Sequence, residues 1–229
     1  MNQHLISHEV KPVFSYAWLT RKQQIWATNS AGWDFEGADL QCVVCRTTNP
    51  ASDEPADAIM IVLVTIADIK RNDPGAFKVL RHVSTAGHTA CSGPHIKYTN
   101  LRVPKKNVLC SPGHGAPIVS AAFDCTAVLV GAMSVGIMRA AFDAALAFAK
   151  SDNRRGASQL LERQAVADLL SGIKMKAEAC RALTWKAAFG LENGPGDYNA
   201  RRETALATKI YCSDECTKAV TEAINVVGM

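Results

Sequence analysis

Cysteines are the side chains most suited to binding a metal ion, and the chain has eight of them. Cys42 and Cys45 have the two-residue gap of a zinc knuckle, and Cys212 and Cys216 lie one helical turn apart. Because side chains alternate between the faces of a strand, Cys42 and Cys45 would point in opposite directions in the strand predicted below. No second pair at ligand spacing accompanies Cys212 and Cys216. We therefore expect buried or half-buried thiols and no metal site.

Histidines and glycines offer two further kinds of chemistry. His88 and His95 are of the type used in acid–base catalysis. Neither has a partner residue at a spacing that indicates a catalytic triad or a metal site. We expect both to be ordinary loop or strand residues. Gly113, His114 and Gly115 lack the third glycine of a dinucleotide-binding loop, so this segment predicts a turn.

Two groups of residues could bind a ligand instead. Trp26 and Thr28 place an indole close to a hydroxyl, which suits an apolar wall with a fixed hydrogen-bonding group. Arg154 and Gln164 supply a guanidinium and an amide ten residues apart. Each group also has an ordinary structural interpretation: Trp26 and Thr28 are typical of a strand in a core, and Arg154 with Arg155 is typical of a solvated basic turn.

The chain before about Pro117 is rich in Val, Thr, His and Pro, which predicts short strands. These strands must position Trp26 and Thr28. Strands are predicted at 40–46, 58–66, 77–83 and 95–103, the last ended by Pro104. Residues 14–27 carry Trp18 and Trp26 on either side of a polar run, which predicts a hairpin. Five or six short strands with no helix between them indicate an antiparallel sheet or a small barrel.

Long helices must position the second group. Helices are predicted at about 117–150, 158–189 and 197–227, with Asp197 as the N-cap of the third. The first carries small residues that let another helix approach, and the second carries one apolar stripe. The small residues are Gly131, Ala132, Ser134, Gly136 and Ala140; the stripe is Val166, Leu170, Ile173, Ala177, Cys180, Thr184 and Ala187. A bundle follows. Three helices alone would leave apolar surface exposed, so the rest of the bundle comes from outside this chain or from another copy.

Composition excludes several classes of function. The chain is 48% hydrophobic and 20% charged, with a formal net charge of +4, which is ordinary for a globular protein. Its basic residues form scattered pairs, so nucleic-acid binding is not expected. The longest uncharged apolar run, 127–138, is shorter than the ~20 residues that cross a bilayer, so no membrane partner is expected. The N-terminus lacks the features of a signal peptide, which favours an intracellular location.

The order of sheet, Val-Pro exit and long helices resembles the acyl-CoA dehydrogenase superfamily of flavoproteins, and most closely its nitroalkane oxidases. The resemblance runs from about Trp18 to Met229, and residues 1–13 match nothing in that family. The segments that carry it are Trp26-Ala27-Thr28-Asn29-Ser30, Gly32-Trp33-Asp34, Gly37-Ala38-Asp39-Leu40, Cys42-Val43-Val44-Cys45-Arg46, Ser92-Gly93-Pro94-His95, Leu129-Val130-Gly131-Ala132-Met133, Ala149-Lys150-Ser151-Asp152 and Thr208-Lys209-Ile210-Tyr211.

The resemblance implies an α+β fold, in which an antiparallel β-domain precedes a long-helix bundle. Residues 14–116 would form the middle β-domain and residues 117–229 most of a four-helix bundle, with 1–13 as an unmatched N-terminal segment. The family's N-terminal helical domain would be absent. Residues 224–229 resemble the segment just before the family's catalytic carboxylate. The family usually assembles as tetramers, so a homo-oligomer is expected.

The resemblance also implies FAD as cofactor. The Trp26 ring would pack beside the isoalloxazine, and the Thr28 hydroxyl would bond near its N5 and O4 atoms. Arg154 and Gln164 would reach the FAD of a neighbouring subunit, with the guanidinium meeting the pyrophosphate. Arg163 stands where the family usually has a histidine beside this glutamine, so it joins the expected cofactor site.

Thr126 is the catalytic candidate within the chain. It resembles a serine placed near the flavin and the base in nitroalkane oxidases. The structural alternative is a helical threonine whose hydroxyl bonds back to the carbonyl of Ala122.

The implied reaction is the oxidation of a small-molecule substrate, a nitroalkane, to an aldehyde or ketone with nitrite and hydrogen peroxide. A carboxylate would remove the proton next to the nitro group. This carboxylate is expected beyond Met229, so negligible turnover is expected from the chain alone. Two alternatives remain open: a relative that acts on a CoA thioester, and a non-catalytic helical oligomerisation module.

Overall fold

The computed structural model of the chain describes residues 11–12, 23–26, 32, 36–47, 50–87 and 93–228. Trp18, Thr28 and His88 lie outside these residues, as does most of the predicted 14–27 hairpin. The chain divides into two compact units, Met1–Val119 and Ser120–Met229, which are described separately below.

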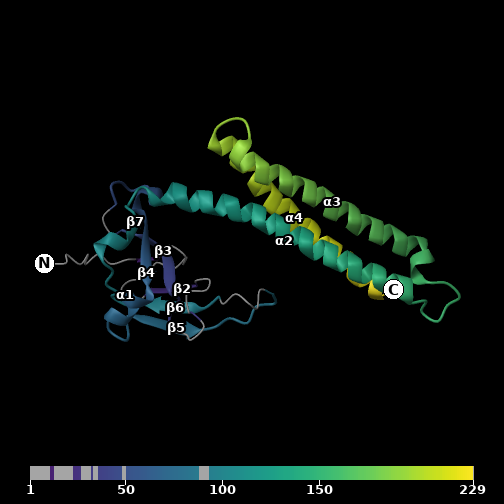
Figure 1. Cartoon of the computed structure of the whole chain (residues 1–229), viewed down its shortest axis with the longest axis horizontal. Helices are drawn as coiled ribbons and strands as arrows, with labels where there is room; N and C mark the ends of the chain where they lie inside the picture. The colour runs from purple at the N-terminus through teal and green to yellow at the C-terminus, as the bar shows by residue number, and fades with distance from the viewer. Residues whose placement is uncertain are drawn as a thin grey trace. The chain divides into compact units, whose positions relative to one another are not determined.

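The first unit has two antiparallel sheets within the described residues (Figure 1). One has the strand order β1-β3-β4-β7, and the other has the order β2-β6-β5. The strands are β1 (Lys11–Pro12), β2 (Gln23–Trp26), β3 (Leu40–Arg46), β4 (Ile59–Thr65), β5 (Phe77–Arg81), β6 (His95–Tyr98) and β7 (Val108–Cys110). The predicted α+β class with antiparallel strands before long helices is confirmed.

The core of this unit follows from the alternation of side chains along each strand. In β3, Val43 and Cys45 are buried while Cys42 is exposed, so the two cysteines do point to opposite faces as predicted. Val43 and Cys45 pack in one apolar cluster with residues of β4, β5 and β6, namely Met60, Val62, Val64, Phe77, Ile96 and Tyr98. The Tyr98 hydroxyl donates a hydrogen bond to Oε1 of Gln41 inside this core. The two sheets are therefore joined by one apolar core.

A short helix between strands corrects the sequence prediction. The strand predicted at 58–66 ends at Thr65, which caps helix α1 (Ile66–Arg71). The Asp68 amide donates to Thr65 Oγ1 over 3.1 Å, and the Thr65 amide donates to Asp68 Oδ2 over 3.0 Å, which completes a capping box. The prediction that no helix lies between the strands is therefore wrong, because α1 lies between β4 and β5. The strands predicted at 77–83 and 95–103 end early, at Arg81 and Tyr98.

The second unit consists of long helices that run in alternating directions (Figure 1). They are α2 (Gly115–Ser151), α3 (Gln164–Asn193) and α4 (Tyr198–Gly228). The buried residues of α3 are the seven of the predicted stripe. The Ala200 amide donates to Asp197 Oδ1 over 2.9 Å, so Asp197 caps α4 as predicted. However, α3 begins six residues later than expected, because a 3-10 turn at Leu160–Glu162 and an extended Arg163 precede it.

Gly131 allows a close approach of the three helices. A Cβ atom at this position would lie 2.8 Å from Cγ2 of Thr208 in α4 and 2.9 Å from Oγ1 of Thr184 in α3. Such distances are shorter than van der Waals contact, so only glycine fits here without a shift. Gly136 differs, because its ideal Cβ position has no atom within 4 Å. The prediction that small residues of α2 serve helix packing thus holds for Gly131 and not for Gly136.

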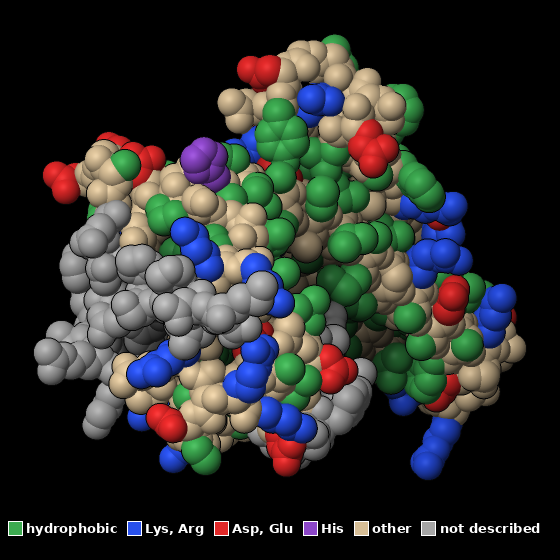
Figure 2. Space-filling model, turned by 60° about the vertical axis from the view of Figure 1, so that its left-hand side comes forward, with side chains coloured by type: hydrophobic (Ala, Val, Ile, Leu, Met, Phe, Trp, Pro, Cys, Tyr) green, Lys and Arg blue, Asp and Glu red, His purple; other side chains and the backbone are tan. Residues whose placement is uncertain are grey.

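Helix α2 is apolar on two opposite sides. Ala127, Val135 and Met138 belong to its buried side. Leu129, Met133 and Ile137 are 60%, 43% and 53% exposed, and we call these three residues the outer stripe. Figure 2 shows hydrophobic side chains at the molecular surface in green. The predicted unburied apolar surface is therefore present.

The same apolarity makes α2 long and hydrophobic enough to cross a bilayer by length and composition alone. About a third of its most apolar 18-residue stretch is buried. Length and hydropathy are weak evidence by themselves, because the core helix of a helical bundle passes the same test.

Candidate functional site

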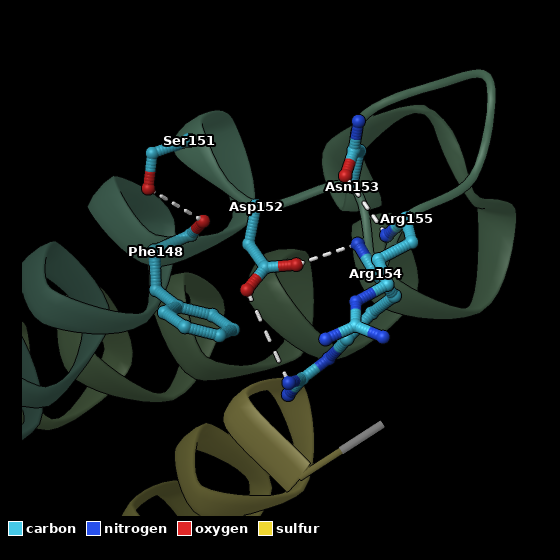
Figure 3. Close-up of a pocket in the computed structure, with 6 residues that line it drawn as sticks. All are labelled: Phe148, Ser151, Asp152, Asn153, Arg154 and Arg155. Carbon is cyan, nitrogen blue, oxygen red and sulfur yellow. Dashed lines mark hydrogen bonds and ion pairs between the residues drawn. The ribbon is translucent and has the colours of Figure 1, made fainter.

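The connection between α2 and α3 brings three of the predicted cofactor residues to one end of the helical unit. Arg154 lies at its start, and Arg163 and Gln164 lie at its end. A hollow of about 470 Å³ opens at this connection (Figure 3). It is lined by Phe148, Ser151, Asp152, Asn153, Arg154 and Arg155.

Arg154 and Arg155 adopt left-handed backbone conformations, with φ of 49° and 58°. Such angles are uncommon for residues other than glycine and cost energy unless neighbouring groups stabilise them. Here the Arg154 amide donates to Oδ1 of Asp152 over 2.6 Å, and the Arg155 amide donates to Oδ1 of Asn153 over 2.9 Å. The short polar side chains of Asp152 and Asn153 therefore hold the turn in shape.

The guanidinium of Arg154 has several partners within the same unit. Its Nη1 lies 3.9 Å from Oδ2 of Asp152, and its Nη2 donates a hydrogen bond to the main-chain carbonyl of Val227, near the end of α4. The guanidinium carbon also lies 5.2 Å from the centre of the Phe148 ring. Figure 3 shows the arginine between Asp152 and the last turn of α4. Arg154 thus joins the α2–α3 connection to α4.

Two more cations border the connection. The guanidinium of Arg155 makes no hydrogen bond or ion pair within the described part of the chain. Nη2 of Arg163 lies 3.6 Å from the ideal Cβ position at Gly156, so this side chain turns back toward the loop. Gln164 instead donates to Oδ1 of Asp168 over 2.7 Å on its own helix. The loop carries more positive than negative charge, which suits an anionic group such as a diphosphate.

Thr126 lies on the exposed side of α2, one turn before the outer stripe. Its hydroxyl donates to the carbonyl of Phe123 over 2.9 Å. The expected back-bond is therefore present, but its acceptor is Phe123 rather than Ala122, because the hydroxyl bonds three residues back instead of four.

The main chain of Trp26 pairs with that of His95 in the sheet formed by β2, β6 and β5. His95 is thus a strand residue, as expected. Thr28, the other half of the predicted pair, lies outside the described residues. Further along the chain, the amide of His114 donates to the carbonyl of Ser111 over 3.1 Å, which confirms the predicted turn.

A buried ionic cluster in the helical unit was not predicted. The carboxylate of Asp124 is fully buried and accepts a hydrogen bond from the Tyr198 hydroxyl over 2.8 Å. Nε of Arg202 lies 3.0 Å from the same carboxylate. Burial, followed by the hydrogen bond to Asp124, raises the pKa of Tyr198. The sequence held a signal for this cluster, because Asp124 is the one charged residue between positions 115 and 138.

The thiols of the helical unit are also buried. Sγ of Cys212 lies 3.8 Å from the carbonyl oxygen of Cys180, which joins α3 to α4. Burial, with a hydrogen bond to Cys212, raises the pKa of Cys180 to about 12. Burial also raises the pKa of Cys45 to about 12. Among the described residues, no three His, Cys, Asp or Glu side chains are grouped so that they could hold a metal ion.

Comparisons with known proteins agree with this architecture. The family described as "Acyl-CoA dehydrogenase, C-terminal domain" matches residues 113–229. Nitroalkane oxidase of Podospora anserina is 63% identical over 215 residues, which cover 93% of this chain and 50% of that protein. Nitroalkane oxidase of Fusarium oxysporum is 42% identical over 219 residues, again covering 93% of this chain and 50% of that protein.

A solved structure gives the same result. The structure of Podospora anserina nitroalkane oxidase has a TM-score of 0.86 with this chain at 58% identity. The match covers 97% of this chain and 53% of the other. The chain therefore spans about half the length of the curated relatives it matches. The family match covers more than half of this chain, including all three long helices. The chain belongs to the acyl-CoA dehydrogenase family.

Proposed function

We propose that the chain is part of an FAD-dependent oxidoreductase of the nitroalkane oxidase type. The observation that carries the proposal is the 63% identity with the Podospora anserina nitroalkane oxidase across 93% of this chain. The reaction converts a nitroalkane to an aldehyde or ketone, releases nitrite, and yields hydrogen peroxide when oxygen takes up the electrons. The expected intracellular location stays a prediction.

The chemistry of the α2–α3 connection suits the diphosphate of FAD. Arg154 and Arg155 line the hollow, Arg163 turns back toward the same loop, and guanidinium binds phosphate oxygens in paired hydrogen bonds. The amide of Gln164 would supply a neutral donor at the first turn of α3. Bound FAD would supply the capacity to accept two electrons from the substrate.

Trp26 and Thr28 would be the ring-binding residues. Trp26 would provide an apolar wall for the flavin, and Thr28 would provide a hydroxyl that donates to it. Thr126 would be the catalytic candidate of this chain; its hydroxyl lies on the exposed side of α2 and donates to the Phe123 carbonyl. The proton next to the nitro group would pass to a carboxylate acting as general base.

A second candidate is an enzyme that acts on a CoA thioester. The family match over residues 113–229 supports this candidate, because the family takes its description from acyl-CoA dehydrogenases. Both substrates lose a proton next to an electron-withdrawing group, so the same general architecture serves either. The higher identity to nitroalkane oxidases favours the nitroalkane as substrate.

We also propose that the protein is a homo-oligomer. The outer stripe of α2 leaves large apolar side chains exposed on a helix whose other side is already packed. Patches of this kind commonly mark association surfaces. A second copy would cover the stripe and bring the neighbouring α2–α3 connection to a shared cofactor.

The test uses the purified chain with FAD and separates the proton-transfer step from the redox step. FAD binding is followed by flavin absorbance and by quenching of flavin fluorescence. A nitroalkane is then supplied both in its neutral form and as its preformed nitronate anion, because the anion needs no general base. We expect the nitronate to bleach the flavin without oxygen and to release nitrite. Binding of a saturated acyl-CoA thioester needs no general base, and we expect the chain not to bind it tightly.

Two outcomes would contradict this proposal. Tight binding of the acyl-CoA thioester, together with no bleaching by the nitronate, would favour the second candidate. A folded, oligomeric chain that takes up no FAD would favour the non-catalytic helical module.

A further inference from the structure

We propose that Asp124 is a positioning residue for Thr126: by bonding to α4, it sets the rotation of α2 at the turn that carries the Thr126 hydroxyl. This inference rests on the proposed function, in which Thr126 is the catalytic candidate of the chain. Asp124 acts through the helix and not on the substrate, because its carboxylate is fully buried in the helical unit.

Asp124 and Thr126 lie on opposite sides of α2. Each residue of an α-helix is turned by about 100° from the one before it, so two positions correspond to about 200°. Asp124 is accordingly buried, whereas Thr126 is exposed. A contact that holds the Asp124 side chain inward therefore turns the Thr126 side chain outward.

The contacts of the Asp124 carboxylate come from two residues that lie one turn apart on α4. The Tyr198 hydroxyl donates to Oδ2 over 2.8 Å, Nη2 of Arg202 donates to Oδ1 over 3.2 Å, and Nε of Arg202 lies 3.0 Å from Oδ2. A carboxylate that faces the planar guanidinium in this way has a strong directional preference. Because a buried carboxylate without these partners would carry an uncompensated charge, α2 has little freedom to turn at this point.

The apolar contacts beside Asp124 do not fix the rotation in the same way. Val128, one turn further along α2, packs with Ala187 of α3 and Ala205 of α4. The two alanines present only methyl groups, and apolar contact has no preferred direction, so this packing tolerates a small rotation. The orientation of this part of α2 therefore depends on the ionic cluster of Asp124 with its two partners.

The Thr126 hydroxyl follows any rotation of α2, because it is bonded to the helix itself. It donates to the carbonyl of Phe123 over 2.9 Å. A side-chain atom about 5 Å from the helix axis moves by about 1 Å when the helix turns by about 10°. A displacement of about 1 Å from the productive geometry can slow a reaction roughly a hundredfold. A small loss of order in the ionic cluster is therefore enough to be measured at Thr126.

The experiment uses variants of the full chain. Asp124→Asn and Tyr198→Phe disturb the cluster, Thr126→Ala removes the hydroxyl, and each of the first two is also combined with Thr126→Ala. Tyr198→Phe keeps the contact between Asp124 and Arg202, so it decides the question if Asp124→Asn does not fold.

Glu222→Gln is the matched control. It breaks the ion pair of Glu222 with Lys176, in which Nζ lies 2.8 Å from Oε1 and which also joins α4 to another helix. This pair is separate from the Asp124 cluster, so its loss tests whether any broken contact between helices has the same effect.

The first readout is the NMR resonance of the Thr126 methyl group in a chain with isotope-labelled threonine methyl groups. The resonance is identified by its absence in Thr126→Ala, and the measurement needs no cofactor. We expect this resonance to shift in Asp124→Asn and in Tyr198→Phe, because the helix turns relative to its neighbours. It should keep its position in Glu222→Gln.

The second readout is the rate at which a preformed nitronate bleaches the bound flavin without oxygen, measured over a range of nitronate concentrations. We expect Asp124→Asn to lower the limiting rate about ten- to hundredfold and to change the half-saturating concentration less than about twofold. Tyr198→Phe should lower the limiting rate less, because the Arg202 contact remains. In the Thr126→Ala background, neither change should lower the rate by more than about twofold, since the positioned group is already gone.

Two results would overturn the inference. One is a Thr126 methyl resonance that stays in place in every folded variant of the cluster. The other is a loss of limiting rate that is equally large with and without the Thr126 hydroxyl, because Asp124 would then act by another route. If the unchanged chain binds no FAD or is not bleached by the nitronate, the proposed function fails by itself, and the methyl resonance still decides whether Asp124 positions Thr126.

Discussion

Replacing Gly131 by alanine should destabilise the helical unit, although alanine is the better helix former. The added Cβ would lie 2.8 Å from Thr208 Cγ2 and 2.9 Å from Thr184 Oγ1, on two different helices. Helix α2 would have to move away from both, and overpacking of this kind costs about 1–3 kcal/mol. The gain in helix propensity is about 1 kcal/mol. We therefore expect a net loss of about 1 kcal/mol in the free energy of unfolding.

The matched control is Gly172→Ala in α3. Its ideal Cβ position has its nearest neighbours at 3.5 and 3.6 Å, on Lys176 and Glu222, which is ordinary contact. This variant should be stabilised by about 1 kcal/mol, because only the helix propensity changes. We therefore expect the two glycine-to-alanine changes to shift the free energy of unfolding in opposite directions.

Chemical denaturation followed by the helical circular dichroism signal measures both effects. In the Gly131→Ala background, Thr208→Ser removes the methyl group that causes the shorter contact, so it should recover part of the lost stability. If Gly131→Ala stabilises the chain as much as Gly172→Ala does, the close packing of α2 against α3 and α4 is wrong.

Three further perturbations test other features of the chain. Asp124→Asn should lower the free energy of unfolding by about 3 kcal/mol, because Arg202 keeps a charge whose buried partner is gone; an unchanged denaturation midpoint would contradict a buried ion pair. Burial raises the pKa of Cys45 and Cys180 to about 12, so as pH rises the unfolded chain loses these protons first. Stability should therefore be insensitive to these thiols below about pH 8 and fall from about pH 9 toward pH 12. Cys180→Ala should reduce that slope, and an unchanged slope would refute the burial effect. Leu129→Glu places a charge in the outer stripe, so it should shift the proposed homo-oligomer toward monomer in sedimentation experiments; an unaltered distribution would exclude this stripe from the interface.

The long helices could be predicted from the sequence because their periodicity is strong. The seven-residue stripe of α3 was predicted in full, since each member recurs after three or four residues and charged residues stay largely off it. Asp197 was recognisable as a cap because a Gly-Pro-Gly break precedes it. Such local signals need no knowledge of the neighbouring helices.

Helix α1 and strand β7 were not predicted from the sequence. The apolar run that ends β4 continues into Ile66, which hid the boundary with α1, although Thr65 and Asp68 already had the spacing of a capping box. Strand β7 is only three residues long, too short for a periodic pattern. These errors arise because strand propensity and capping act on the same few residues.

The sequence predicted that Arg154, Arg163 and Gln164 lie at one connection between helices, but not the contacts that they make there. Sequence placed Arg154, Arg163 and Gln164 near one another, since all lie around one turn between helices. It could not anticipate left-handed backbones at Arg154 and Arg155, which ordinary residues seldom adopt, nor the contact of Arg154 with Val227, 73 positions later in the chain. Long-range contacts of this kind depend on the packing of α4 beside α2 and α3.

The two-sided apolarity of α2 has a consequence during biosynthesis. This helix leaves the ribosome before α3 and α4, so both of its sides face water until the later helices are made. Nascent chains with exposed apolar surface are the usual substrates of chaperones and are prone to aggregate. Even with α3 and α4 packed against α2, the outer stripe is still exposed in this chain. The yield of folded protein on expression should therefore depend on chaperone supply.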